Sequence, residues 1–400
     1  MRVLVLGAGV VGVTTAYYLS QLGHAVTVVD REPDVACGTS HANAGQLSYS
    51  FTDSLARPDF YAQIPGLMLG RNPGSRLRIN TQLVAWGLRF LAQCTTKHAA
   101  TNTLALLAIA MRSAELMADF QRSVPFEFSH RAAGKLILLT DKTELRSAQR
   151  SCALKRANGC DTDVLTREES ISIEPVLADI NEKFIATVYS KDDTVADARQ
   201  FTTGLRDHLE SSRQVAFRLN TEVSAIETVQ GRFKHVALDN ETIEADAIVV
   251  CAGVQSAALL RPLGIRLPIY PVRGYSVTLP TASASPSVSI TAQRRRFVLS
   301  RLGDRIRIAG LADFVGNNSD ADQERIQSLL QLARRIAPRA ADYGAADCQP
   351  WANSRPMTPD GRPFVGPSAI DRLYLNTGHG MLGWTLAHAC AADVADAVAR

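Results

Sequence analysis

Three glycines near the N-terminus, Gly7, Gly9 and Gly12, have the spacing of a turn that holds the phosphates of a dinucleotide. We expect Gly7 to permit a tight turn, Gly9 to let the backbone approach a pyrophosphate, and Gly12 to let the next helix pack closely on the strand. Val10 and Val11 then begin a helix whose unpaired N–H groups and positive dipole end would face the pyrophosphate. The motif therefore predicts an anion-binding turn at the start of the chain.

An acidic residue stands where a ribose-binding carboxylate is expected, about twenty residues after the turn. This residue, Asp30, closes the apolar run 25–29, and an earlier apolar run, 2–6, precedes the turn. The two runs predict strand, glycine turn, helix and strand. A structural βαβ unit without a ligand is the alternative, but the combined spacing favours an adenine dinucleotide as the ligand.

Two further stretches carry small and polar residues in patterns that suit a ligand. Residues 38–46 read GTSHANAGQ and lack bulky apolar side chains, so their backbone suits a flat polar ligand, with a plain connecting loop as the alternative. Residues 377–384 read TGHGMLGW, follow an expected strand at 373–376 and open a helix from about Leu382. The start of that helix would offer N–H donors and a positive dipole end.

The remaining elements are predicted from periodicity. The buried strand 247–250 ends in Cys251-Ala252-Gly253, a second strand and small-residue turn that would lie near the first, although an ordinary βα turn is the alternative. Alternating segments at 270–279, 287–292, 296–301 and 305–309 predict an antiparallel sheet. Residues 351–363 are interpreted as a turn-rich stretch that carries two arginines.

Composition limits the classes of function. The 400 residues are 46% hydrophobic and 20% charged, and a net charge of +4 gives no sign of nucleic-acid binding. The seven cysteines include no CxxC pair and no zinc spacing, so we expect neither a metal site nor a disulfide framework. An odd count without a framework favours a reducing, cytoplasmic compartment.

One segment could touch a membrane without crossing it. Residues 64–70 form an apolar stretch followed by Arg71, Arg76 and Arg78, which would suit an anionic membrane surface, while packing against the rest of the protein is the alternative. No stretch reaches the roughly 18 to 20 apolar residues of a spanning helix. The expected location is cytoplasmic, with peripheral contact at the inner face of the cytoplasmic membrane.

Taken together, the ordered motifs resemble the FAD-dependent D-amino acid oxidase family. They are GxGxxG with its acid, GTSHANAGQ, VVCAG, RPMTPDGRPFVG and NTGHGMLGWTLA, and they span essentially the whole chain. Within that family ANAGQ, YPVRGYSVTLP and TGHGMLGWT most resemble the bacterial D-amino acid dehydrogenases. D-hydroxyproline dehydrogenases, glycine oxidases and opine oxidase catalytic subunits share most of these features and stay as alternatives.

The resemblance implies a mixed α/β fold, in which a doubly wound, Rossmann-like FAD domain is interleaved with a substrate domain built on an antiparallel sheet. The FAD domain would comprise residues 1–50, 192–266 and 350–400. The substrate domain would comprise residues 51–191 and 267–349.

The resemblance also implies which residues hold the cofactor. The chain would contact the ADP half of FAD, its adenine, the flavin through a loop, and the flavin N1 and C2 carbonyl through the C-terminal turn. The residues implied are Gly7, Gly9, Val10, Val11, Gly12, Asp30, Arg31, Thr39, Ser40, Asn43, Ala44, Gly45, Gln46, Val223, Ala252, Gly253, Gly378, Gly380, Met381 and Leu382. The sarcosine oxidase branch attaches FAD through a cysteine in C-x-Y-T-x-T-P-D. Asn353 stands at that position here, so non-covalent FAD is expected.

Three residues are the candidates on the substrate side. Arg355 matches the family's arginine that binds the substrate carboxylate, and a guanidinium fork suits that task. Tyr275 would donate to the carboxylate or line the pocket, with Tyr270 as the alternative. His379 is expected to lie in the C-terminal turn and to shape the surroundings of the cofactor, rather than to act as a base.

The implied reaction is oxidative deamination of a small D-amino acid by hydride transfer from Cα to flavin N5, giving a 2-oxo acid or, from D-proline types, a cyclic imine. Electrons would pass to a quinone or to another acceptor that is not oxygen. The chain could also be the flavin subunit of a hetero-oligomer. A non-catalytic, flavin-bound assembly protein is the alternative from another class.

Overall fold

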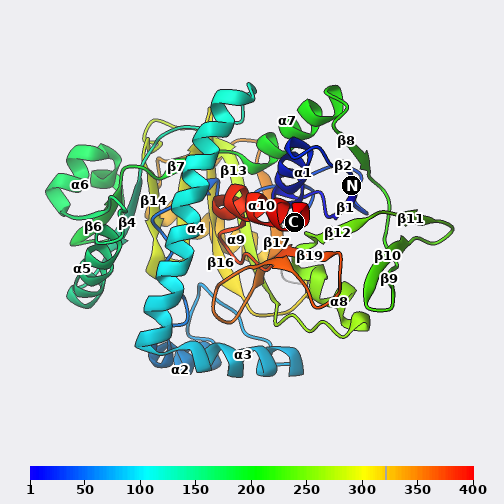
Figure 1. Ribbon diagram of the computed structural model, residues 1–400. Coiled ribbons are helices and arrows are strands. Elements are labelled where there is room, and N and C mark those ends of the chain that lie inside the picture. The colour runs from blue at the N-terminus through cyan, green and yellow to red at the C-terminus, as the bar shows by residue number, and fades with distance from the viewer. Residues whose placement is uncertain (320–321) are drawn as a thin grey trace.

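Two sheets lie side by side in the computed structural model, which describes residues 1–319 and 322–400 (Figure 1). The first has six strands in the order β18-β19-β12-β1-β2-β8, and all neighbours are parallel except the pair β18 and β19. Its strands are β1 (Arg2–Leu6), β2 (Ala25–Val29), β8 (Val215–Arg218), β12 (Ala247–Val250), β18 (Phe364–Pro367) and β19 (Leu373–Thr377).

The central strands of this sheet are covered on both faces, which explains their continuous apolar sequences. Val3 and Val5 of β1 face a core shared with the helices, whereas Leu4 and Leu6 face a second core. The helices on the first face are α1 (Val10–Gln21), α7 (Ala198–Ser211) and α10 (Gly383–Ala399). The second face is covered by β9 (Ala225–Val229), β10 (Arg232–Ala237), β11 (Thr242–Glu244) and α8 (Ser256–Leu260).

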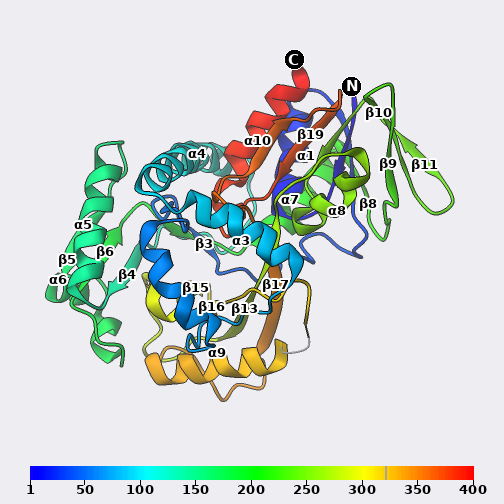
Figure 2. The same ribbon diagram turned by 90° about the horizontal axis from the view of Figure 1, so that it is seen from below.

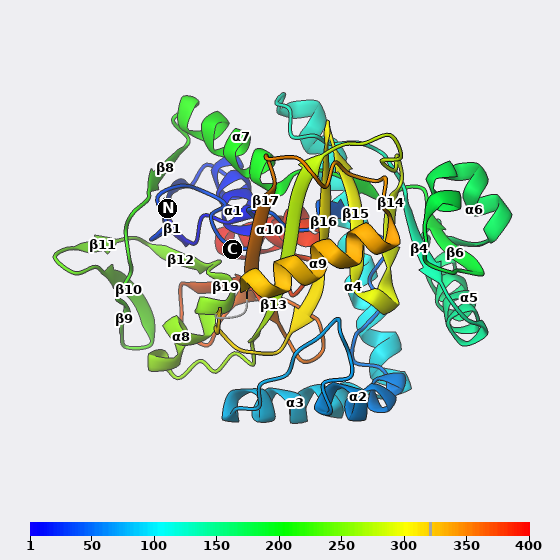
Figure 3. The ribbon, with the colours of Figure 1, turned by 180° about the vertical axis from the view of Figure 1, so that it is seen from behind.

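The second sheet has eight strands in the order β17-β13-β16-β15-β14-β4-β6-β5, antiparallel except between β14 and β4. Helix α9 (Asp322–Ile336) lies across its back in Figure 3, where Leu329 and Ala333 join the core. The strands are β4 (Lys135–Leu139), β5 (Asp163–Thr166), β6 (Ala186–Ser190), β13 (Tyr270–Pro280), β14 (Ser289–Ala292), β15 (Phe297–Leu302), β16 (Arg305–Asp313) and β17 (Gln349–Met357).

The remaining elements connect and cover the sheets. Helices α2 and α3 lie together at the bottom of Figure 1, and α3 faces the viewer in Figure 2, which is seen from below. These elements are β3 (Gln46–Leu47), α2 (Ile64–Met68), α3 (Thr81–Gln93), α4 (Thr96–Ser123), α5 (Lys142–Arg156), α6 (Arg167–Ile173), β7 (Thr194–Val195) and the 3-10 turns η1 (Pro58–Gln63), η2 (Pro175–Asp179), η3 (Gly253–Gln255), η4 (Arg261–Leu263) and η5 (Gln293–Arg295). None of the described helices is long and apolar enough to cross a membrane.

The expected mixed α/β fold with parallel and antiparallel sheets is confirmed. One local interpretation was wrong, because residues 351–357 are not a turn but most of strand β17. Pro350 and Pro356 are tolerated in this strand because β17 is an edge strand, which pairs with β13 alone. The predicted domain boundaries stay a prediction. Residues 350–357 pair with the eight-stranded sheet, and β18, β19 and α10 belong with the six-stranded one.

Candidate active site

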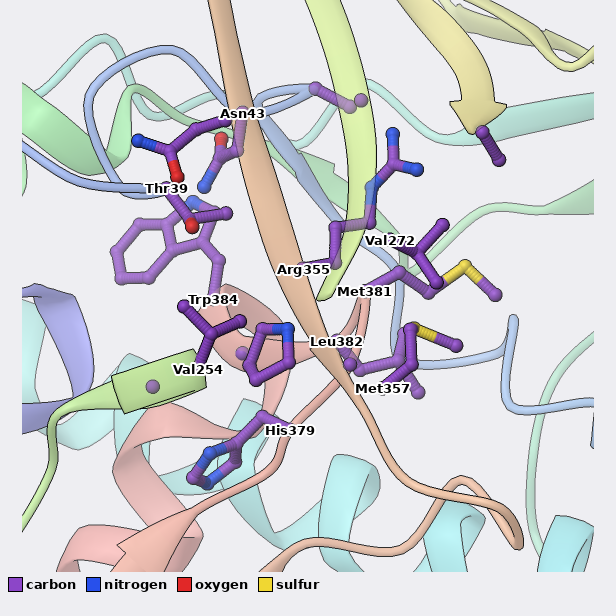
Figure 4. A pocket seen from close by; sticks show the side chains of 18 of the residues that line it. Thr39, Asn43, Val254, Val272, Arg355, Met357, His379, Met381, Leu382 and Trp384 are labelled. Atoms are coloured by element: carbon purple, nitrogen blue, oxygen red, sulfur yellow. The ribbon is translucent and has the colours of Figure 1, made fainter. Parts of the chain in front are cut away.

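A cavity of about 1470 Å³ takes in most of the predicted site residues. It is lined by the β1–α1 turn, the loop after β2, the turn after β12, parts of β13 and β17, and the turn before α10. Figure 4 shows lining side chains from the loop after β2, from β13 and β17, and from the turn before α10. The predicted residues that line it are Gly7, Gly9, Val10, Val11, Asp30, Arg31, Thr39, Ser40, Asn43, Ala44, Gln46, Val223, Ala252, Gly253, Tyr275, Arg355, His379, Gly380, Met381 and Leu382.

Three predicted glycines, Gly12, Gly45 and Gly378, do not line the cavity. A Cβ on Gly12 would lie 1.8 Å from the carbonyl oxygen of Gly7, so a larger residue would force α1 away from the turn. A Cβ on Gly45 would lie 2.9 Å from a methyl group of Leu302, and one on Gly378 would lie 3.0 Å from Thr358 Cγ2. These glycines allow close packing around the cavity.

The β1–α1 turn has the geometry of an anion-binding turn. Gly7 has φ +109°, and a Cβ there would lie 2.7 Å from the carbonyl oxygen of Cys251. Gly9 is the N-cap of α1 and has no side chain that could bond the first N–H groups. The N–H of Val10 donates to Ser40 Oγ at 3.0 Å, which holds the 38–46 loop against the start of the helix. The turn therefore suits a pyrophosphate.

Asp30 stands at the end of β2, beside this turn. Its Oδ2 accepts from the N–H of Ala8 at 2.6 Å, and its Oδ1 accepts from the N–H of Glu32 at 3.0 Å. A carboxylate oxygen has two lone pairs, so both oxygens retain capacity for hydroxyl groups. The N–H of Thr221 donates to the Asp30 carbonyl, which brings the chain that leads to Val223 to the same end of the cavity.

The C-terminal turn is tied to strand β17. Gly378 and Gly380 have φ +78° and +57°, and the N–H of Gly380 donates to the carbonyl of Pro356 at 3.0 Å. His379 between them is buried, and its Nε2 has no hydrogen-bond partner among the described residues. Burial lowers the pKa of His379 to about 4, so the ring is neutral at pH 7.

Arg355 extends from β17 into the cavity, and Figure 4 shows its guanidinium pointing away from His379. Its Nη1 donates to the carbonyl of Leu311 at 3.2 Å, and no carboxylate pairs with it in the described part of the chain. Gly274 on β13 leaves the space for it, because a Cβ there would lie 2.3 Å from Arg355 Nη2. Burial, followed by the nearby Arg296, lowers its pKa to about 10, so it stays charged at neutral pH.

Tyr275 lines the cavity, but its hydroxyl donates to Asp313 Oδ2 at 3.0 Å. Asp313 is buried and also receives two bonds of 2.8 Å from Arg325, so this carboxylate is well satisfied. Burial and the charge of Asp313 raise the pKa of Tyr275. Its hydroxyl proton is thus directed to Asp313. The alternative tyrosine, Tyr270, does not line the cavity and packs in a separate core with Trp86.

Sequence reasoning missed two residues that shape this end of the cavity, Gly274 and Arg296. Arg296 lines the cavity and has a left-handed backbone, with φ +50°. Nothing in the run Arg294-Arg295-Arg296 distinguishes its third member. The first two members form exposed ion pairs with Asp141 and Glu182. The role of Gly274 becomes visible only when β13 and β17 are paired.

The arrangement can hold a long phosphate-containing cofactor and a small carboxylate. The glycine turn and Asp30 form one end, where they suit the pyrophosphate and ribose of a dinucleotide. The α10 turn follows, and the other end carries a charged guanidinium beside the apolar Val272 and Met357. These features fit FAD together with an amino-acid substrate. Across residues 1–319 and 322–400, no cluster of His, Cys, Asp or Glu could hold a metal ion.

Comparisons with known proteins find matches over nearly the whole chain. The family model described as FAD dependent oxidoreductase matches residues 2–397. The chain is 41% identical to D-amino acid dehydrogenase 2 of Ralstonia nicotianae, covering 100% of this chain and 97% of that protein. It is 38% identical to D-amino acid dehydrogenase of Dechloromonas aromatica, over 100% and 97% of the two chains.

Solved structures show the same fold. Glycine oxidase from Geobacillus kaustophilus superposes with a TM-score of 0.77 at 21% identity, over 100% of this chain and 95% of that one. L-alpha-glycerophosphate oxidase from Mycoplasma pneumoniae, solved with FAD bound, gives a TM-score of 0.73 at 19% identity, over 100% and 94%. At these identities the likeness concerns the fold alone.

Proposed function

We propose a specific reaction for this chain, which belongs to the DAO family of FAD dependent oxidoreductases. It is a D-amino acid dehydrogenase, which oxidises a D-amino acid to the imine that water hydrolyses to a 2-oxo acid and ammonia. The assignment to D-amino acids rests on the relatives of 38–41% identity that match the full chain. The observation in the site that carries it is the charged, carboxylate-free guanidinium of Arg355 inside the cavity.

The residues proposed to hold FAD fall into three groups. The β1–α1 turn and Asp30 bind the pyrophosphate and ribose, since they offer backbone N–H groups and free carboxylate lone pairs. The loop from Thr39 to Gln46 and the turn Ala252-Gly253 line the same cavity and would run beside the cofactor. The start of α10 would offer N–H groups and a positive dipole end to the ring system. With Asn353 in place of a cysteine, the attachment is non-covalent.

The chain's own residues then position and orient the substrate. FAD, when bound, supplies the acceptor for the hydride that leaves Cα. Arg355 binds the substrate carboxylate as a rigid fork and thereby fixes the direction of the Cα–H bond. Neutral His379 lines the wall beside the ring system without adding charge. No side chain is assigned the role of base, because a substrate bound with a neutral amine needs no proton removed by the protein.

The test replaces Arg355 by Met and by Lys in purified holoenzyme. Loss of a buried carboxylate clamp lowers kcat/KM for D-alanine by roughly 30- to several thousand-fold. Lys restores the charge without the fork and recovers part of the activity. Activity is measured with a dye acceptor on D-alanine, D-proline, D-hydroxyproline and glycine, and flavin absorbance verifies that both variants retain FAD.

The panel separates this proposal from its alternatives. Oxidation of glycine or of an N-carboxyalkyl amino acid without any of the D-amino acids would contradict it in favour of a glycine or opine oxidase. Full retention of activity in Arg355→Met would contradict the assigned role of the arginine. Flavin binding without turnover of any substrate would favour an assembly protein. The proposed acceptor is a quinone or another non-oxygen acceptor, so turnover with the dye should exceed turnover with oxygen.

A further inference from the structure

A second arginine faces the cavity beside Arg355. Arg296 follows the 3-10 turn η5 and is itself in the left-handed region. Its Nη1 lies 3.5 Å from the carbonyl oxygen of Ala312, and Arg355 Nη1 donates to the carbonyl of Leu311. Because Leu311 and Ala312 are consecutive, both guanidinium groups are held at the same short stretch of β16.

Close backbone packing positions Arg296 at this stretch of β16. A Cβ on Gly310 would lie 2.2 Å from the carbonyl oxygen of Arg296, so only glycine permits the approach of the two segments. The N–H of Leu311 donates to that same carbonyl at 2.9 Å. Leu311 itself has φ +54°, which is uncommon for a residue with a branched side chain. Such backbone conformations cluster at functional sites.

The charges at this end of the cavity do not balance. Asp313 forms an ion pair with Arg325, which leaves the guanidinium charges of Arg296 and Arg355 in excess. Asp313 is already committed to Arg325 and to the hydroxyl of Tyr275. No ion pair joins Arg296 or Arg355 to an acid within the described ranges. A ligand with one carboxylate neutralises only half of the excess.

We propose that the preferred substrate carries two carboxylates, one bound by Arg355 and the other by Arg296. This inference rests on the proposed function and names its substrate class. Charges removed from water require partners, and a guanidinium binds a carboxylate through paired hydrogen bonds. The second carboxylate stands on the side chain, as in D-glutamate and D-aspartate.

The first experiment compares pairs of substrates that differ in one charge. With the dye acceptor, kcat/KM for D-glutamate exceeds that for D-glutamine by about 30-fold or more, and D-aspartate likewise exceeds D-asparagine. Equal rates within every pair would overturn the inference.

The second experiment measures, in variants, the ratio of kcat/KM for D-glutamate to kcat/KM for D-glutamine. Arg296→Met removes the charge and keeps an unbranched apolar side chain, so the ratio falls toward one. Arg295→Met is the matched control, because Arg295 is adjacent, half exposed and paired with Glu182, and does not line the cavity. The control keeps the ratio of the wild type. A ratio that stays high in Arg296→Met would overturn the role of this residue.

A binding measurement separates this inference from turnover. Glutarate and valerate have chains of equal length and differ by one carboxylate, and the Tm of the holoenzyme reports binding to the folded state. Glutarate raises Tm more than valerate does, and Arg296→Met removes the difference. If D-alanine is oxidised but glutarate raises Tm no more than valerate does, the inference fails and the proposed function stands. If no D-amino acid is oxidised, the proposed function fails, whichever acid binds.

Discussion

At the scale of single residues, the position of Arg355 depends on what its neighbours lack. Gly274 offers no Cβ on the strand opposite, and Leu311 turns a carbonyl toward the guanidinium through a left-handed backbone. Neither neighbour contributes a charge or a side-chain hydrogen bond. The orientation of the fork is therefore set by backbone geometry, and the site is sensitive to small volume changes next to it.

The substitution Gly274→Ala tests this dependence. The added methyl group would overlap Arg355 Nη2. Because a guanidinium is the mobile end of a long side chain, we expect the guanidinium to move while the backbone stays in place. We expect kcat/KM for the preferred amino acid to fall by about tenfold or more, with FAD content and Tm near those of the wild type. Steady-state kinetics and flavin absorbance measure both quantities.

A matched glycine serves as the control. Gly87 lies inside α3, and a Cβ there meets nothing within 4 Å. Gly87→Ala should leave the kinetics unchanged and stabilise the helix by roughly 0.5–1 kcal/mol. Unchanged kinetics in Gly274→Ala would contradict the positioning role of Gly274.

At the scale of elements, four helices meet around one histidine. His388 on α10 is fully buried, and its Nδ1 lies 3.1 Å from the hydroxyl of Tyr18 on α1. Its ring packs against Phe120 of α4 and Phe201 of α7. Burial lowers its pKa to about 3, so the helices pack around a neutral ring.

This burial predicts acid sensitivity. In the unfolded chain a histidine takes up its proton near pH 6.5, whereas folded His388 does so only near pH 3. Between these values the unfolded state binds one more proton, so the free energy of unfolding decreases by about 1.4 kcal/mol per pH unit as the pH falls. His388→Gln keeps an acceptor for Tyr18 and removes the contribution of His388 to that slope, whereas buried His379, with its lowered pKa, keeps its own contribution. Urea unfolding of the FAD-saturated protein from pH 6.5 to 4.5 measures it.

His98→Gln is the control for this measurement, because His98 is exposed on α4 and buries no ring. It should follow the wild-type dependence on pH. If His388→Gln loses stability with acid as steeply as the wild type, then His388 does not account for the sensitivity.

The elements also show what sequence could and could not predict. The β1–α1 turn was predictable, because the left-handed Gly7 and the close contact at Gly12 each demand glycine locally. Strand β17 was misread, since an edge position that tolerates proline is a property of the assembled sheet. The position of Arg296 depends on the close approach of Gly310, which no local pattern reveals.

At the scale of the whole molecule, α2 and α3 form one side, at the bottom of Figure 1, and η1, α2, α3 and their connections carry several exposed apolar side chains. Buried aromatic residues of the same elements, Trp86 and Phe90, line the cavity, so this side stands close to the site. We propose that this face, defined here as the α2–α3 face, rests on an anionic membrane. Its exposed apolar and basic residues are Tyr61, Met68, Leu69, Ile79, Val84, Leu88, Arg71, Arg78 and Arg89.

Co-sedimentation with vesicles tests the α2–α3 face. The protein should sediment with vesicles that contain anionic lipid and be released by salt, because basic residues are screened as ionic strength rises. The double substitution Leu69→Ser with Leu88→Ser should weaken binding severalfold without changing kcat/KM for a soluble dye. Val229→Ser removes an equally exposed apolar side chain from β9 and is the control. Equal loss in both variants would contradict the proposed face.

The order of strands in the six-stranded sheet limits how much of the protein can fold during translation. Strand β1 lies between β2 and β12, and β12 in turn pairs with β19, near the other end of the chain. A nascent chain therefore leaves the ribosome with one edge of β1 unpaired until β12 emerges, which at 5–20 residues per second takes roughly 12 to 50 s. The dinucleotide turn and the guanidinium fork come into register only after translation has nearly ended. Premature termination should yield aggregation-prone fragments that cannot retain flavin.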